Sequence, residues 1–261
     1  MTDDFSQLFD LMDRWRHLPK YKLEGNLQPF FGLVLKDILS KNLKVQVLDP
    51  VIPEFPLLID TQSNGKQQRR SKNVDFLALT EKEKENERTA YLVELKTDNA
   101  SFKYGQLKDY LEFADKGLCH LVKGVLYIAG GGGARQRKNK YGHLLHLLEK
   151  LELITIKEQD ILYKQYTKKP NSWPNVLRPD NISLHPDISS ISTKVVYIVP
   201  DKCKFNEFLQ NSKLDLKEYL RVISFKEIQL EPQYAKFDCW LHQLADKEKK
   251  AGKPCPRTIH K

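Results

Sequence analysis

The spacing of apolar residues predicts helices in the first forty positions of the chain. An amphipathic helix is expected from about Phe5 to Arg16. A second helix is expected to follow a short loop, with Asn26 as a plausible N-cap and Pro29 in its first turn. Its apolar positions recur at helical spacing and should form one buried face: Leu27, Phe31, Val34, Leu35, Ile38 and Leu39.

Three segments with the composition of β-strands follow these helices. The first spans about residues 43–60, where three prolines indicate an edge or irregular strand. The second is "NVDFLAL" (73–79), and the polar, basic stretch Thr61 to Lys72 should separate the two. The third is "AYLVELK" (90–96), after a charged stretch with the composition of an exposed hairpin loop.

The pattern changes again after Ser101. Leu107, Leu111 and Ala114 share one face of an expected helix, and "LVKGVLYIAGGGG" (121–133) has the pattern of a buried strand that ends in a glycine run. The order helix, strand, strand, strand, helix, strand predicts an α/β or α+β core with a central mixed sheet flanked by helices.

The second half of the chain predicts an insertion followed by a return to regular structure. One helix is clear at 141–152, and a connection rich in Pro, Asn and Trp (168–187) is long enough for an insertion or an active-site flap. Strands at 193–201 and 219–228 and helices at 204–213 and 235–250 follow. We expect a single domain over 1–245, with its core at about 20–130 and 193–230, an insertion at about 140–192 and a C-terminal helix.

Charged residues inside the apolar strands are the first candidates for chemistry. Glu94 and Lys96 lie on the same side of their strand because alternate residues share a face, and Asp75 is the only charge in "NVDFLAL". If the two strands form a hairpin, Asp75 and Glu94 converge at one end of the sheet, where their repulsion calls for a cation. Carboxylates and water are the ligands that Mg²⁺ prefers. The alternative is that Glu94 and Lys96 form a solvent-facing pair on an antiparallel strand.

These residues resemble the signature of the PD-(D/E)xK nuclease superfamily, which has the restriction-endonuclease-like fold. Asp75 followed by Glu94-Leu95-Lys96 on the next strand matches its D…(D/E)xK pattern, although Asn73-Val74-Asp75 lacks the proline of the name. Gln106 and Tyr110 match the Q-x-x-x-Y motif that RecB-like members carry on the following helix. The tripeptide [DE]xK also occurs at Asp215 to Lys217 and at Glu248 to Lys250, but only the copy at 94–96 follows an acidic strand and precedes this helix.

The resemblance implies a metal-dependent nuclease that hydrolyses phosphodiester bonds, most often in DNA. Asp75, Glu94 and the Leu95 carbonyl would bind Mg²⁺ or Mn²⁺. Lys96 would stabilise charge on the attacking water or on phosphorus. Gln106 would position water, Lys96 or a phosphate, with support from Tyr110.

The resemblance also implies an acid on the helix before the first strand. Glu24 is the candidate, although its surroundings do not match the G-x-x-x-E of RecB-like members and it falls just before the expected helix. Glu54 in "VIPEFPL" is the rival, and it could equally be a structural acid on an edge strand.

Charge and composition favour a polyanionic partner. The formal net charge is +9, and basic residues cluster at 65–72, 134–143 and 246–261, the last expected to be a flexible tail. Residues expected to contact nucleic acid are Arg69, Arg70, Lys72, Lys103, Tyr110, Arg135, Arg137 and Lys138. The resemblance leaves open a homodimer and membership of a larger DNA-processing or defence complex.

The sequence predicts an intracellular, cytoplasmic protein. Its four cysteines are far apart and form no C-x-x-C pair, as expected for free thiols in a reducing compartment. No signal peptide or membrane span is expected. Two other functions stay open: a nucleic-acid-binding protein of the same fold that does not cut, and an interaction module with incidental positive charge.

Overall fold

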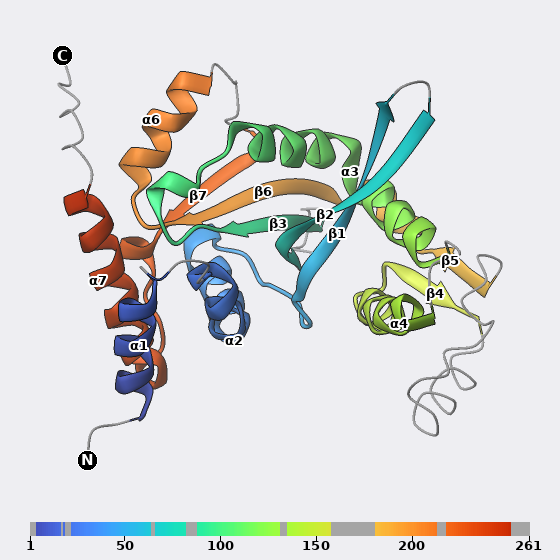
Figure 1. Cartoon of the computed structure of the whole chain (residues 1–261). Coiled ribbons are helices and arrows are strands. Elements are labelled where there is room, and N and C mark those ends of the chain that lie inside the picture. The colour runs from blue at the N-terminus through green and yellow to red at the C-terminus, as the bar shows by residue number, and fades with distance from the viewer. Residues whose placement is uncertain are drawn as a thin grey trace. The chain divides into compact units, whose positions relative to one another are not determined.

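The protein is α+β, with helices flanking a five-stranded mixed sheet (Figure 1). The computed structural model describes residues 4–16, 18, 22–63, 66–81, 88–130, 135–157, 181–212 and 218–251. The sheet has the order β1-β2-β3-β6-β7, in which β1 and β2 are antiparallel and β6 and β7 are parallel. The strands are β1 Ile52–Ser63, β2 Lys66–Leu79, β3 Thr89–Leu95, β6 Ser192–Val199 and β7 Leu220–Ser224. The expected class and the mixed sheet are therefore confirmed.

The chain divides into two compact units, and the first contains both ends of the chain. It comprises Met1–Val47, Val93–Asp109 and Val195–Lys261. In it, helix α1 (Asp4–Trp15) packs against helix α7 (Ala235–Ala251), as Figure 1 shows. The Phe9 ring stacks on Phe237 at 5.6 Å and on Trp240 at 5.4 Å between ring centroids. Helix α6 (Lys202–Ser212) packs against β7.

Helix α2 (Leu23–Leu43) has the predicted buried face but begins earlier than predicted. All six apolar positions expected on that face are buried. Leu23 is buried as well, one turn before Leu27, so the apolar stripe extends back by a turn. Lys22 is the N-cap, and the Asn26 side chain donates to its carbonyl at 2.9 Å. The expected Asn26 cap is therefore wrong, Pro29 lies inside the helix, and Glu24 lies in the first turn.

The second unit comprises Leu48–Leu92 and Tyr110–Lys194, and strands β1 and β2 form a long hairpin within it. The register pairs Ile52 with Leu77 at one end and Ser63 with Lys66 at the other. The polar stretch Thr61 to Lys72 was expected to separate two short strands, but most of it is strand. That expectation was wrong because backbone pairing does not require apolar side chains, so alternation detects only the buried part of a strand.

The strand expected at 121–133 is also wrong, because helix α3 (Tyr104–Gly130) continues through 121–130; 131–133 lie outside the described residues. Its buried residues recur at helical spacing and form one face: Leu118, Leu121, Val122, Val125 and Ala129. A short apolar run fits a strand and a buried helix equally well by composition. The strand beside β3 is instead β6, and the Lys96 backbone N–H donates to the Ile198 carbonyl at 2.9 Å.

The sequence between α3 and β6 forms small elements of its own. Helix α4 (Arg135–Lys150) confirms the helix expected at 141–152 and packs against β4 (Ile154–Ile156), which pairs with β5 (Ile182–Leu184). Most of the Pro, Asn and Trp-rich connection lies outside the described residues.

Three further expectations, for the C-terminal tail, membrane spans and cysteines, can be compared with the structure. Helix α7 continues to Ala251 and so includes 246–251, which were expected to begin a flexible tail; 252–261 lie outside the described residues. No helix in the described ranges is long and apolar enough to cross a membrane. Cys119, Cys203 and Cys239 carry free thiols.

Gly117 provides a test of the kink inside α3. Its backbone angles are φ 77° and ψ 164°, a conformation that almost only glycine adopts, although a Cβ there would meet no atom within 4 Å. We expect Gly117→Ala to lower the free energy of unfolding by about 1–3 kcal/mol in urea denaturation. Gly25→Ala, in α2 and also in open space, is the control and should be neutral or stabilising. Equal effects of the two changes would contradict the kink.

Candidate metal centre

Glu94 and Lys96 form a buried ion pair at the end of β3. Glu94 is 2% exposed and Lys96 is 4% exposed, and the Lys96 Nζ lies 2.6 Å from Glu94 Oε1. The alternative of a solvent-facing pair is therefore wrong. Burying two charges is costly unless further contacts compensate both.

Gln106 also contacts Glu94. It lies in the first turn of α3, and its Nε2 donates to the same Oε1 that contacts Lys96. The end of β3 and the start of α3 therefore lie together, as the sequence predicted. Gln106 holds the Glu94 carboxylate in one orientation, because a carboxylate oxygen with two donors has little freedom to rotate.

Glu24 is the helix acid that lies near this pair. Both of its carboxylate oxygens lie 3.4 Å from the Lys96 Nζ, so the lysine faces two carboxylates. The rival Glu54 is exposed on β1, where it accepts a hydrogen bond from the Asn73 side chain at 2.9 Å. The structure therefore favours Glu24 over Glu54 at this position.

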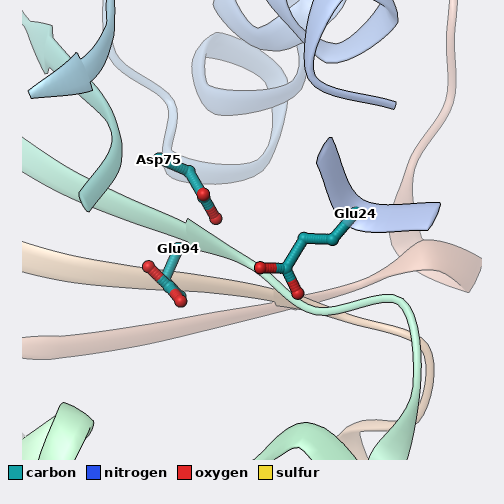
Figure 2. Close-up of side chains that lie close together, drawn as sticks. All are labelled: Glu24, Asp75 and Glu94. Atoms are coloured by element: carbon teal, nitrogen blue, oxygen red, sulfur yellow. The ribbon is translucent and has the colours of Figure 1, made fainter. Parts of the chain in front are cut away.

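The carboxylates of Glu24, Asp75 and Glu94 form one acidic group (Figure 2). Each offers an oxygen, and these oxygens all lie within 4.8 Å of one another. Two oxygens on opposite sides of one hard cation lie roughly 4–5 Å apart, so the spacing of these carboxylate oxygens is of the same order. The formal charges of three carboxylates and the Lys96 ammonium sum to −2. The three carboxylates could therefore hold a metal ion.

The pKa of Glu24 reflects its burial and the charges around it. Burial raises the pKa of its carboxyl above the ordinary value, and the nearby Glu94 and Asp98 raise this pKa further, while Lys96 lowers it. Asp98 was not among the predicted residues. It lies two positions after Lys96, and that alternate spacing was the only signal that could have identified it.

The raised pKa of Glu24 predicts a pH dependence of stability. The folded protein binds this proton more tightly than the unfolded chain, so Glu24 favours folding at acidic pH and loses that contribution as pH rises through the raised pKa. In EDTA at neutral pH we therefore expect Glu24→Gln to have a higher melting temperature than wild type. The difference should shrink as pH falls toward the ordinary carboxyl pKa. A Glu24→Gln variant that is less stable than wild type in EDTA at neutral pH would contradict this.

Tyr110 does not have the predicted role of contacting nucleic acid. Its side chain is fully buried, its hydroxyl donates to the Asn73 carbonyl at 3.0 Å, and the Lys72 ammonium lies 5.3 Å from its ring centroid. A fully buried ring cannot stack on a base, so that expectation is wrong, and Tyr110 supports β2 from α3.

The remaining candidates are placed only in part. Leu95 ends β3 between Glu94 and Lys96, and metal binding by its carbonyl stays a prediction. Lys103 is exposed just before α3. The side chains of five predicted nucleic-acid-binding residues lie outside the described part of the structure: Arg69, Arg70, Arg135, Arg137 and Lys138.

Sequence reasoning missed the role of Glu248. Its [DE]xK tripeptide lies in α7 and was set aside, yet Glu248 is only 9% exposed and pairs with Arg16, the residue after α1. No tripeptide pattern distinguishes a buried, paired acid such as Glu248 from a surface acid. The signal available was the amphipathic pattern of α7, which places Glu248 on the same helical face as Leu241, Leu244 and Ala245.

Comparisons with known proteins do not identify a relative. No protein-family model, curated protein sequence or solved structure matches this chain.

Proposed function

We propose that this protein is a metal-dependent nuclease of the PD-(D/E)xK type that hydrolyses phosphodiester bonds of nucleic acid, with DNA as the favoured substrate; its basic charge supports a polyanionic substrate. The observation that carries the proposal is the buried Glu94–Lys96 pair, in contact with Glu24 and Gln106. Buried charges at the end of a strand are costly and are retained where chemistry needs them. The mixed sheet, with a helix before its first strand and Gln106 on the helix after β3, is compatible with a restriction-endonuclease-like core.

Glu24, Asp75 and Glu94 would hold Mg²⁺ or Mn²⁺, together with the Leu95 carbonyl. When bound, such an ion polarises a phosphate oxygen and lowers the pKa of a coordinated water. The protein's own contribution is to fix three carboxylates that would otherwise repel one another, and to keep Lys96 beside them.

Lys96 would stabilise negative charge as it develops on the attacking water or on the phosphate. Lys96 is 4% exposed, so the field of its ammonium is less screened there than at the surface. Gln106 acts as a positioning residue through its hydrogen bond to Glu94. The basic residues expected to contact the backbone would hold the strand near this site.

The proposal is tested with a panel of circular duplex DNA, linear duplex DNA, single-stranded DNA and RNA, each incubated with Mg²⁺, Mn²⁺ or EDTA. We expect cleavage of at least one substrate with a metal and none in EDTA. Salt-dependent binding without cleavage under any metal would instead support a nucleic-acid-binding protein of the same fold. Absence of both cleavage and binding at low salt would favour an interaction module.

A further inference from the structure

The buried carboxylate of Glu248 contacts the segment that connects the two ends of the candidate site. Its Oε1 pairs with the Arg16 guanidinium, and its Oε2 accepts the backbone N–H of Asn99 at 3.3 Å. The Asn99 side-chain amide also donates to the Glu248 backbone carbonyl, at 3.4 Å. The two side chains of the ion pair are 12% and 11% exposed, so Glu248 is largely removed from solvent.

The segment that Glu248 contacts runs from Lys96 to Gln106. Both of those residues bond to the same oxygen of Glu94, so the segment is fixed to Glu94 at each end. Between them the chain forms a short 3₁₀ turn, Asn99–Ser101, whose N-cap Asp98 makes no side-chain capping bond. The Phe102 ring then packs edge-on against Phe205, with centroids 5.0 Å apart.

We propose that Glu248 is a positioning residue for the candidate site: by holding Asn99, it fixes the chain between Lys96 and Gln106 and so the placement of both around Glu94. This rests on the proposed function for its catalytic consequence. The expected effect on the reaction rate is geometric, because a displacement of about 1 Å at reacting groups can lower the rate on the order of 100-fold. The negative charge of Glu248 strengthens its hydrogen bond from the Asn99 N–H, and the Arg16 guanidinium compensates that buried charge.

A pair of double variants separates positioning from stability. Arg16→Met with Glu248→Gln removes both charges but keeps an oxygen that can accept the Asn99 N–H. Arg16→Met with Glu248→Leu removes both charges and the acceptor. Neither leaves an unpaired buried charge, so both should fold, which thermal unfolding checks.

We expect kcat for nucleic-acid cleavage to be about tenfold or more lower in the Leu double variant than in the Gln double variant, with KM the same in both. If Glu248 had a purely structural role, the melting temperatures of the two double variants would differ. Their kcat values, measured well below those melting temperatures, would then be equal. Lys247→Gln is the matched control, because it breaks a different ion pair, Lys247 of α7 to Asp13 of α1 at 2.5 Å, and leaves Asn99 untouched. Its kcat should equal that of wild type.

Amide hydrogen exchange of metal-free protein provides a readout that needs no activity. The Asn99 amide should exchange faster in the Leu double variant than in the Gln double variant. In Lys247→Gln it should exchange at the wild-type rate. Equal exchange, or equal kcat, in the two double variants overturns the inference. If wild type itself cleaves nothing, the proposed function fails, and the exchange rates still decide whether Glu248 holds this segment.

Discussion

Lys96→Ala is expected to lower the rate of phosphodiester cleavage by about 100- to 1000-fold at saturating substrate, the typical cost of losing one group that stabilises developing charge. The Lys96 ammonium contacts Glu94 at 2.6 Å and Glu24 at 3.4 Å, so it is fixed beside the carboxylates rather than sampling solvent. Its removal leaves those carboxylates in place. Metal binding should therefore persist or strengthen while hydrolysis is lost.

This separation of binding from hydrolysis makes the variant diagnostic. Lys96→Met, which fills the space better, should behave in the same way and guards against a packing defect. Lys123→Ala removes a positive charge from an exposed position of α3 and should leave kcat unchanged. If the Lys96→Ala protein is folded and cleaves at the wild-type rate, Lys96 takes no part in the reaction.

Glu94→Gln is expected to abolish both divalent-cation binding and cleavage, the latter by at least about 100-fold. The amide keeps the shape of the side chain but removes one of the three negative charges that would hold the ion. Wild type at a metal concentration 100 times its Kd should gain about 2.7 kcal/mol of stability, and Glu94→Gln should gain none. Isothermal titration and thermal unfolding with Mn²⁺ measure the two effects.

Glu54→Gln is the matched control for this variant. Glu54 was the rival acid, and it is exposed on β1 with Asn73 as its partner. Its change to glutamine should leave metal binding and cleavage as in wild type. If Glu54→Gln abolished metal binding and Glu94→Gln did not, the acidic group would be assigned to the wrong residues.

Much of the candidate site could be predicted because its residues break local rules. Glu94 and Lys96 are charges in an apolar strand, and alternation on a strand places them on one face. The fixed spacing from Lys96 to the next helix brings Gln106 back to Glu94. Glu24 was harder to place because its helix begins a turn earlier than its apolar pattern indicated.

The parts of the fold that were mispredicted are those where composition does not distinguish two structures. Residues 121–130 are apolar enough for a strand, but packing along one face makes them helical. Thr61 to Lys72 is polar enough for a loop, but pairing extends the β1–β2 hairpin through most of it. The contact between Glu248 and Asn99 joins residues 149 positions apart, and no local pattern reports such a contact.

A single-turnover cleavage experiment, with protein in excess over DNA so that product release does not limit the rate, provides the decisive measurement. Wild type and Lys96→Ala would be compared side by side in Mg²⁺ and in EDTA. We predict rapid cleavage by wild type in Mg²⁺, none in EDTA, and a loss of about 100-fold or more for Lys96→Ala. Cleavage by wild type that persists in EDTA, or equal rates for wild type and Lys96→Ala in Mg²⁺, would contradict a metal-dependent site built around Glu94 and Lys96.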